Sequence, residues 1–174
     1  MNPRIILSGC SAGGKSTLLR ELERRSYAIV AEPGRKIVQQ QQASGGNALP
    51  WSDMRAFLEL TLEQALADHQ QQHDSPVFFD RSLIDAAAGL ARLGQPQWLE
   101  RLRDDCRYHP QVFLTPPWPE LYQQDAQRKL AMTEALLEYE HLIQVYPTLG
   151  YEIHLLPKTG VAKRADWLLD RLGF

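Results

Sequence analysis

The sequence predicts a single α/β domain in which a parallel sheet carries helices on both faces. Short apolar and β-branched runs alternate with longer segments of helical periodicity along all 174 residues, and this alternation is typical of parallel α/β folds. The run at 4–8 shows no polar alternation, as expected of a strand that is buried on both faces. The expected strands lie at 4–8, 27–31, 77–80, 111–115 and 151–156.

The segments between these runs have the three- and four-residue spacing of apolar positions that helices show. Ser52 and Ser82 precede two of the segments and are expected to cap them. Pro147 and Gly150 are expected to end the longest helix before the last strand. The expected helices lie at 15–25, after Ser52, at 82–93, through 132–143 and at 161–172.

Two segments interrupt the pattern and are predicted to be loops. Gln39 to Asn47 is a polar run that ends in glycines, and Thr115 to Asp125 is rich in proline and aromatic residues. Both follow predicted strands, where α/β folds place their ligand-contacting connections. We expect one domain over 1–174 with a mobile lid around 115–130.

Composition limits the partners and the compartment that we expect. No run of about 20 apolar residues is present, so no membrane partner is expected. The formal net charge of −2 provides no global basic surface, which argues against a nucleic-acid partner. Cys10 and Cys106 are the only cysteines, which fits a reducing cytoplasm rather than a disulfide framework.

The phosphate-binding motif is the most specific signal. Gly9 to Ser16 reads G-C-S-A-G-G-K-S and matches G-x-x-x-x-G-K-[ST], directly after a predicted strand and before a predicted helix. Lys15 is expected to reach the β- and γ-phosphates of ATP or another NTP, and Ser16 to hold Mg²⁺. The residues predicted to contact the nucleotide are Gly9, Ser11, Ala12, Gly13, Gly14, Lys15, Ser16 and Thr17.

A carboxylate ends the strand V-F-F-D at Asp80. Asp80 would hold Mg²⁺, act as a base on an acceptor hydroxyl, or pair with Arg81 at the surface. Asp85, at the start of the next helix, would serve either the helix dipole or the site.

Glu32 occupies a similar place after the second predicted strand, in A-E-P-G-R. Pro33 and Gly34 are expected to make a tight turn that fixes the direction of this carboxylate. Arg35 would bind an anionic substrate or pair with Glu32.

Two residues follow the proline-rich loop. Arg128 would close over the phosphates as a lid arginine that neutralises developing charge, or else be a solvated helix residue. Asp125 is expected to cap the long helix.

Together these motifs resemble the nucleoside and nucleotide kinase branch of the P-loop proteins, and most nearly the AAA-type ATPase group that includes ribosylnicotinamide kinase domains. The resemblance rests on Glu32-Pro33-Gly34-Arg35, on Asp80-Arg81-Ser82, and on the stretch L-P-K-T-G-V-A-K-R that ends at Arg164. It covers nearly the whole chain.

The resemblance implies a three-layer P-loop NTPase fold with a five-stranded parallel sheet in the order 2-3-1-4-5. It also implies that the loop from Pro157 to Val161 packs against the adenine base. A ring ATPase is not expected, because the chain is too short to carry the helical domain that supplies an arginine finger.

The leading functional hypothesis is a kinase that phosphorylates a small-molecule acceptor, namely a nucleoside, a nucleotide or a ribosyl compound. Asp80 or Glu32 would deprotonate the acceptor hydroxyl, which Glu32, Arg35 and Arg81 would bind. The residues expected to act in transfer are Lys15, Asp80, Glu32, Arg81 and Arg128. An NTPase without a dedicated acceptor and a non-catalytic nucleotide-binding module are the alternatives.

Overall fold

A computed structural model describes residues 2–11, 13–121 and 126–174, with only the backbone given for 121 and 126–131. Within these residues a five-stranded parallel sheet has the order β2-β3-β1-β4-β5, which confirms the expected order. The strands are β1 (Arg4–Gly9), β2 (Ala28–Val30), β3 (Val77–Asp80), β4 (Gln111–Thr115) and β5 (Glu152–Leu155).

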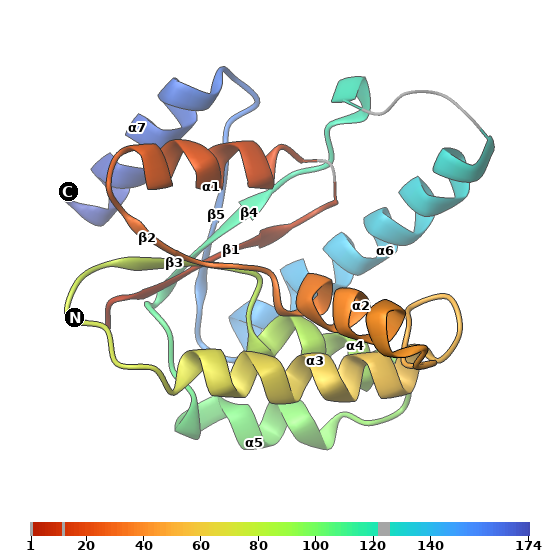
Figure 1. Ribbon diagram of the computed structural model, residues 1–174. Helices are drawn as coiled ribbons and strands as arrows, with labels where there is room; N and C mark the ends of the chain where they lie inside the picture. The colour runs from red at the N-terminus through yellow and green to blue at the C-terminus, as the bar shows by residue number, and fades with distance from the viewer. Residues whose placement is uncertain (1, 12, 122–125) are drawn as a thin grey trace.

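Helices cover both faces of the sheet. In Figure 1, α1 and α7 lie over one face, and α3, α4 and α5 lie on the opposite side. The helices are α1 (Lys15–Arg24), α2 (Pro33–Ser44), α3 (Met54–His69), α4 (Leu83–Arg92), α5 (Gln97–Asp105), α6 (Ala126–Thr148) and α7 (Val161–Leu172), with a 3₁₀ turn, η1 (Pro119–Leu121). In the described part of the chain no helix is long and apolar enough to span a membrane.

Alternate residues of the strands supply two separate cores. Ile5 and Leu7 of β1 face α1 and α7, whereas Ile6 between them faces the larger cluster formed with α4 and α6. Successive strand side chains point to opposite faces, so one short apolar strand serves both cores. Burial of both faces fixes the register of the strands. It therefore also fixes where each strand ends relative to its neighbours at the edge of the sheet.

The end of β1 lies very close to the end of β4. Gly9 is paired with Thr115 in the ladder and has a φ of 108°, and a Cβ built there would lie 2.5 Å from the backbone nitrogen and oxygen of Thr115. Thr115 Oγ1 also donates to the carbonyl oxygens of Ser8 and Cys10 at 3.2 Å. The phosphate loop therefore leaves the sheet against a neighbouring backbone that admits only glycine.

The predicted loop over Gln39 to Asn47 was wrong in its first part, because α2 continues to Ser44. Glutamine favours helices, and only Gly45, in the left-handed conformation, ends this one. The tight turn expected at Pro33 and Gly34 is instead the first turn of α2, with Pro33 at the position where its missing N–H is harmless.

The cap of α3 was predicted wrongly, the end of α6 falls where it was expected, and one helix was not predicted. Asp53, not Ser52, caps α3, and its side chain accepts a hydrogen bond from the Ala56 N–H. Pro147 lies inside the last turn of α6, which ends at Thr148. Helix α5 was not predicted, because it is short and polar and only Leu102 in it is buried.

Gly9→Ala should lower the free energy of unfolding by about 3 kcal/mol, because it adds backbone overlap to an unfavourable φ. Gly160→Ala is the matched control, since its Cβ would meet open space and its φ of −56° is ordinary. Urea unfolding of both variants measures the effect. Equal stability of the two variants would contradict the close approach of β1 and β4.

Candidate functional site

The phosphate loop presents unbonded backbone N–H groups at the start of α1. Gly14 precedes the helix in a left-handed conformation (φ 77°), and among the described residues no side chain caps α1. The first N–H groups of a helix have no partner within it and carry a positive partial charge. This end of α1 therefore fits a phosphate group, as the motif predicts.

Arg164 holds the loop from the side opposite to its N–H groups. Its two guanidinium Nη atoms donate to the carbonyl oxygens of Gly14 at 3.3 Å and Gly13 at 3.1 Å. The guanidinium is buried and lies over the Trp118 ring at 5.7 Å. By tying down the loop carbonyls, Arg164 supports the orientation in which the N–H groups face the phosphates.

Lys15 and Asp80 form a buried ion pair beside the loop. Lys15 Nζ lies 3.3 Å from Asp80 Oδ1, and both side chains are about nine-tenths buried. Burial raises the pKa of the Asp80 carboxyl above 3.8, and this effect exceeds the opposing effect of Lys15. Among the described residues Asp80 Oδ1 accepts no hydrogen bond of regular geometry. A buried oxygen left in this way is suited to a cation or an ordered water.

A magnesium ion fits these residues. Ser16 is exposed on the first turn of α1, and Asp80 supplies the under-bonded carboxylate oxygen. Mg²⁺ is usually held by one or two protein oxygens, with the remaining ligands from phosphate and water. A hydroxyl and a carboxylate oxygen are therefore the kind of ligands that the protein would supply to such a site.

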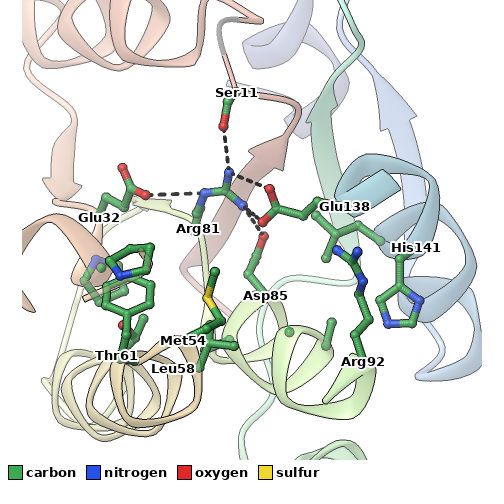
Figure 2. A pocket seen from close by; sticks show the side chains of 18 of the residues that line it. Ser11, Glu32, Met54, Leu58, Thr61, Arg81, Asp85, Arg92, Glu138 and His141 are labelled. Atoms are coloured by element: carbon green, nitrogen blue, oxygen red, sulfur yellow. Dashed lines mark hydrogen bonds and ion pairs between the residues drawn. The ribbon is translucent and has the colours of Figure 1, made fainter. Parts of the chain in front are cut away.

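Arg81 joins four parts of the structure (Figure 2). Its backbone has a φ of 65°, an unusual value for a non-glycine residue that turns the chain from β3 into α4. Its Nη1 lies 2.7 Å from a carboxylate oxygen of Glu138 on α6, and its Nε lies 3.5 Å from one of Glu32. Its Nη2 donates to Ser11 Oγ of the phosphate loop at 3.5 Å.

Burial alone would lower the pKa of the Arg81 guanidinium. The carboxylates of Glu138, Asp85 and Glu32 outweigh that effect and raise the pKa, so Arg81 stays charged in its nearly buried position.

Asp85 is a structural member of the cluster. It completes a capping box at the start of α4 with Ser82. It also accepts hydrogen bonds from Ser8 Oγ and, at 2.7 Å, from Tyr146 Oη. Because buried donors occupy its oxygens, the Asp85 carboxylate is held in one position, and it contacts Arg81 from there.

A cavity of about 610 Å³ opens beside Arg81. Glu32 and Arg81 line its polar end, and apolar side chains of α3 form one wall. Glu138 and His141 of α6 line the opposite wall (Figure 2). This volume is in the range of small-molecule sites, which combine apolar walls with a few polar groups.

The structure brings most of the residues expected in the site to the carboxyl edge of the sheet. Lys15 and Asp80 meet directly, and Glu32 and Arg81 meet at the mouth of the cavity. Arg35 is largely exposed, 3.6 Å from Glu32, and is not among the residues that line the cavity.

Other expected residues lie at the nucleotide side or outside the description. Pro157 and Val161 flank the loop before α7, whose first turn carries Arg164 to the phosphate loop. Ala12 and Asp125 lie outside the described residues, and for Arg128 only its place in α6 is described.

No pattern in the sequence marks Glu138 as part of the site, because it stands 57 residues from its partner Arg81. Arg164 could have been found, since it ends the stretch L-P-K-T-G-V-A-K-R, but nothing there reveals that it bonds to the phosphate loop.

Comparison with protein families gives one match. The family described as "AAA domain" matches residues 4–164. No curated protein matches the chain.

Several solved structures share the fold. Deoxyadenosine kinase from M. mycoides has a TM-score of 0.66 at 14% identity, with 98% of each chain covered. Shikimate kinase from Acinetobacter baumannii has a TM-score of 0.61 at 16% identity, covering 99% of this chain and 93% of that one. The YorR protein of Bacillus subtilis, bound to phosphorylated GDP, has a TM-score of 0.62 at 15% identity, with 98% and 95% covered. At these identities the likeness shows the fold.

Asp80→Asn should leave the free energy of unfolding at neutral pH unchanged or higher, since the ionised carboxylate is unfavourable in its buried position. With a folded-state pKa above 3.8, Asp80 contributes stability at low pH that is lost as pH rises through the raised pKa. The difference in free energy of unfolding between Asp80→Asn and wild type should therefore widen as pH rises through the raised pKa of Asp80. Thermal unfolding from pH 3 to 8 measures it.

Asp85→Asn is the matched control for that experiment. It should destabilise by about 2 kcal/mol or more, because it disturbs buried hydrogen bonds and leaves Arg81 less compensated. Equal losses in the two variants would contradict the different roles of these carboxylates.

Proposed function

The chain belongs to the AAA domain family, and we propose that it is a kinase that transfers the γ-phosphoryl group of ATP or another NTP to a small molecule. The acceptor would be a nucleoside, a nucleotide or a ribosyl compound. Deoxyadenosine kinase and shikimate kinase, which have this fold, act on small molecules.

The observation that carries the proposal is a cavity next to the phosphate loop. Ser11 of the loop lines it together with Glu32 and Arg81. An acceptor bound there would lie beside the terminal phosphate of a nucleotide held at α1. Phosphoryl transfer depends mainly on such positioning and on neutralisation of charge.

Each residue at the phosphate side has a definite task in this proposal. Lys15 and the free N–H groups of α1 bind the β- and γ-phosphates. Ser16 and Asp80 would hold Mg²⁺, which neutralises charge on the phosphates when bound. Arg81, which already contacts Ser11, would stabilise negative charge on the phosphoryl group during transfer.

Glu32 is the better candidate for the base. It lines the cavity and is partly exposed, whereas Asp80 is paired with Lys15 and is not among the lining residues. In the proposed step the acceptor oxygen bonds to the γ-phosphorus, the bond to the diphosphate breaks, and Glu32 accepts the hydroxyl proton. This divides the work between the two carboxylates, with Asp80 at the metal.

Two other functions would use only part of this arrangement. An NTPase without an acceptor needs the phosphate loop and Asp80 but has no use for the cavity. A non-catalytic binding module needs neither the cavity nor a base. The size and polar end of the cavity therefore favour the kinase.

Consumption of ATP with Mg²⁺ should rise at least about 100-fold with one acceptor from a panel of nucleosides, nucleotides and nicotinamide riboside. Lys15→Ala should abolish this turnover, whereas Lys163→Ala, an exposed lysine of α7, should not. A coupled assay for ADP measures both. Turnover that no acceptor changes would indicate the NTPase, and bound ATP without turnover the binding module.

Glu32→Gln should reduce kcat with the best acceptor by about 10²–10⁴-fold, because the amide cannot take the proton. Affinity for ATP should stay within about twofold of wild type, since Glu32 faces the cavity rather than the loop. Steady-state kinetics and nucleotide titration separate these effects. A larger loss of kcat in Asp80→Asn with unchanged Mg²⁺ dependence would instead make Asp80 the base.

A further inference from the structure

The polar end of the cavity holds more negative than positive charge. The Arg81 guanidinium lies within 3.5 Å of carboxylate oxygens from three residues, Glu32, Asp85 and Glu138. One cation thus stands among three carboxylates. Its charge is already compensated before any ligand arrives.

Two of these carboxylates remain available to a ligand. Asp85 is engaged by Ser82 and Tyr146, so its oxygens are occupied. Glu32 and Glu138 contact Arg81 from opposite sides and both line the cavity (Figure 2). A group that docks at this end therefore meets two carboxylates that can accept hydrogen bonds.

A second cation, Arg35, lies 3.6 Å from Glu32, but its side chain is largely exposed and does not line the cavity. Among the described lining residues the only cation besides Arg81 is Arg92. Its side chain is exposed at the last residue of α4. An anion at the Arg81 end would gain little from Arg92, since water and salt screen it.

We propose that this end of the cavity selects an acceptor that presents an uncharged hydroxyl group, and that it discriminates against an acceptor that presents a phosphate. The inference rests on the proposed kinase function and narrows its substrate class. A hydroxyl donates to Glu32 or Glu138 and completes their hydrogen bonding. A phosphate has no proton to donate at neutral pH and is repelled by both carboxylates and by the γ-phosphate that it would face.

The nucleoside class is thereby favoured over the nucleotide class. The apolar wall formed by Met54, Phe57 and Leu58 of α3 suits the uncharged body of such a compound. Gly89 of α4 lets α3 approach closely, since a Cβ there would lie 2.9 Å from Leu58 Cδ1. The hydroxyl end and the apolar body therefore have separate partners in one cavity.

The test compares each nucleoside, and nicotinamide riboside, with its own 5′-monophosphate. The full chain is first saturated with a non-hydrolysable ATP analogue and Mg²⁺, so that the phosphate loop is filled. Calorimetric titration should show that the best uncharged-hydroxyl acceptor binds about tenfold or more tightly than its monophosphate. Equal or tighter binding of the monophosphate, or no binding by any pair, would overturn the inference.

Glu138→Gln supplies the second measurement. It removes one charge without changing shape, so the preference for the nucleoside should fall at least threefold. Glu140→Gln is the matched control, because it makes the same change at an exposed position of α6 that does not line the cavity. An unchanged preference in Glu138→Gln would show that the acidic end is not the cause and would overturn the proposal.

Detection of the phosphorylated acceptor after incubation with ATP separates a failure of this inference from a failure of the proposed kinase function. Transfer to a monophosphate but not to its nucleoside would leave the kinase standing and overturn the inference. Selective binding of the nucleoside with no transfer to it would support the inference and count against the kinase.

Discussion

The compensation of one buried guanidinium organises the site. A guanidinium keeps its proton in proteins, so the nearly buried Arg81 would strongly destabilise the fold if carboxylates did not surround it. The carboxylates come from the start of α2, from α4 and from α6. The same requirement therefore adds a polar link between three helices and sets the polar end of the cavity at their junction.

The phosphate side depends on a different constraint, the space between two strand ends. Gly9 and Gly13 both lie against Thr115, where a Cβ at either would come within 3 Å of it. Arg164 then binds the loop carbonyls from α7. One half of the site is thus positioned by backbone contact and the other by charge. The two halves meet where Arg81 reaches Ser11.

Local signals in the sequence were enough for the strand positions and the phosphate loop, whereas the strand order came from the family resemblance. The strand bounds at 77–80 and 111–115 were predicted to the residue, because each is a short apolar run that stops at a polar residue. The glutamine run was misread as a loop, since polarity outweighed the helix propensity of glutamine. The partnership of Glu138 with Arg81 depends on how α6 crosses α4, which no local pattern encodes. The sequence therefore indicated which residues carry the chemistry but not which of them meet through tertiary contacts.

Two energetically unfavourable features lie at the carboxyl edge of the sheet. Arg81 has a positive φ, and Asp80 has a buried oxygen that lacks a regular hydrogen bond among the described residues. Each is unfavourable in the free protein, and such features persist where binding or chemistry uses them. A module that only binds nucleotide would have no use for an arginine crowded by carboxylates at the mouth of a cavity. In the proposed kinase Arg81 would act on the transferred phosphoryl group and Asp80 would hold the metal. The proposed kinase would therefore use these unfavourable features together with the cavity.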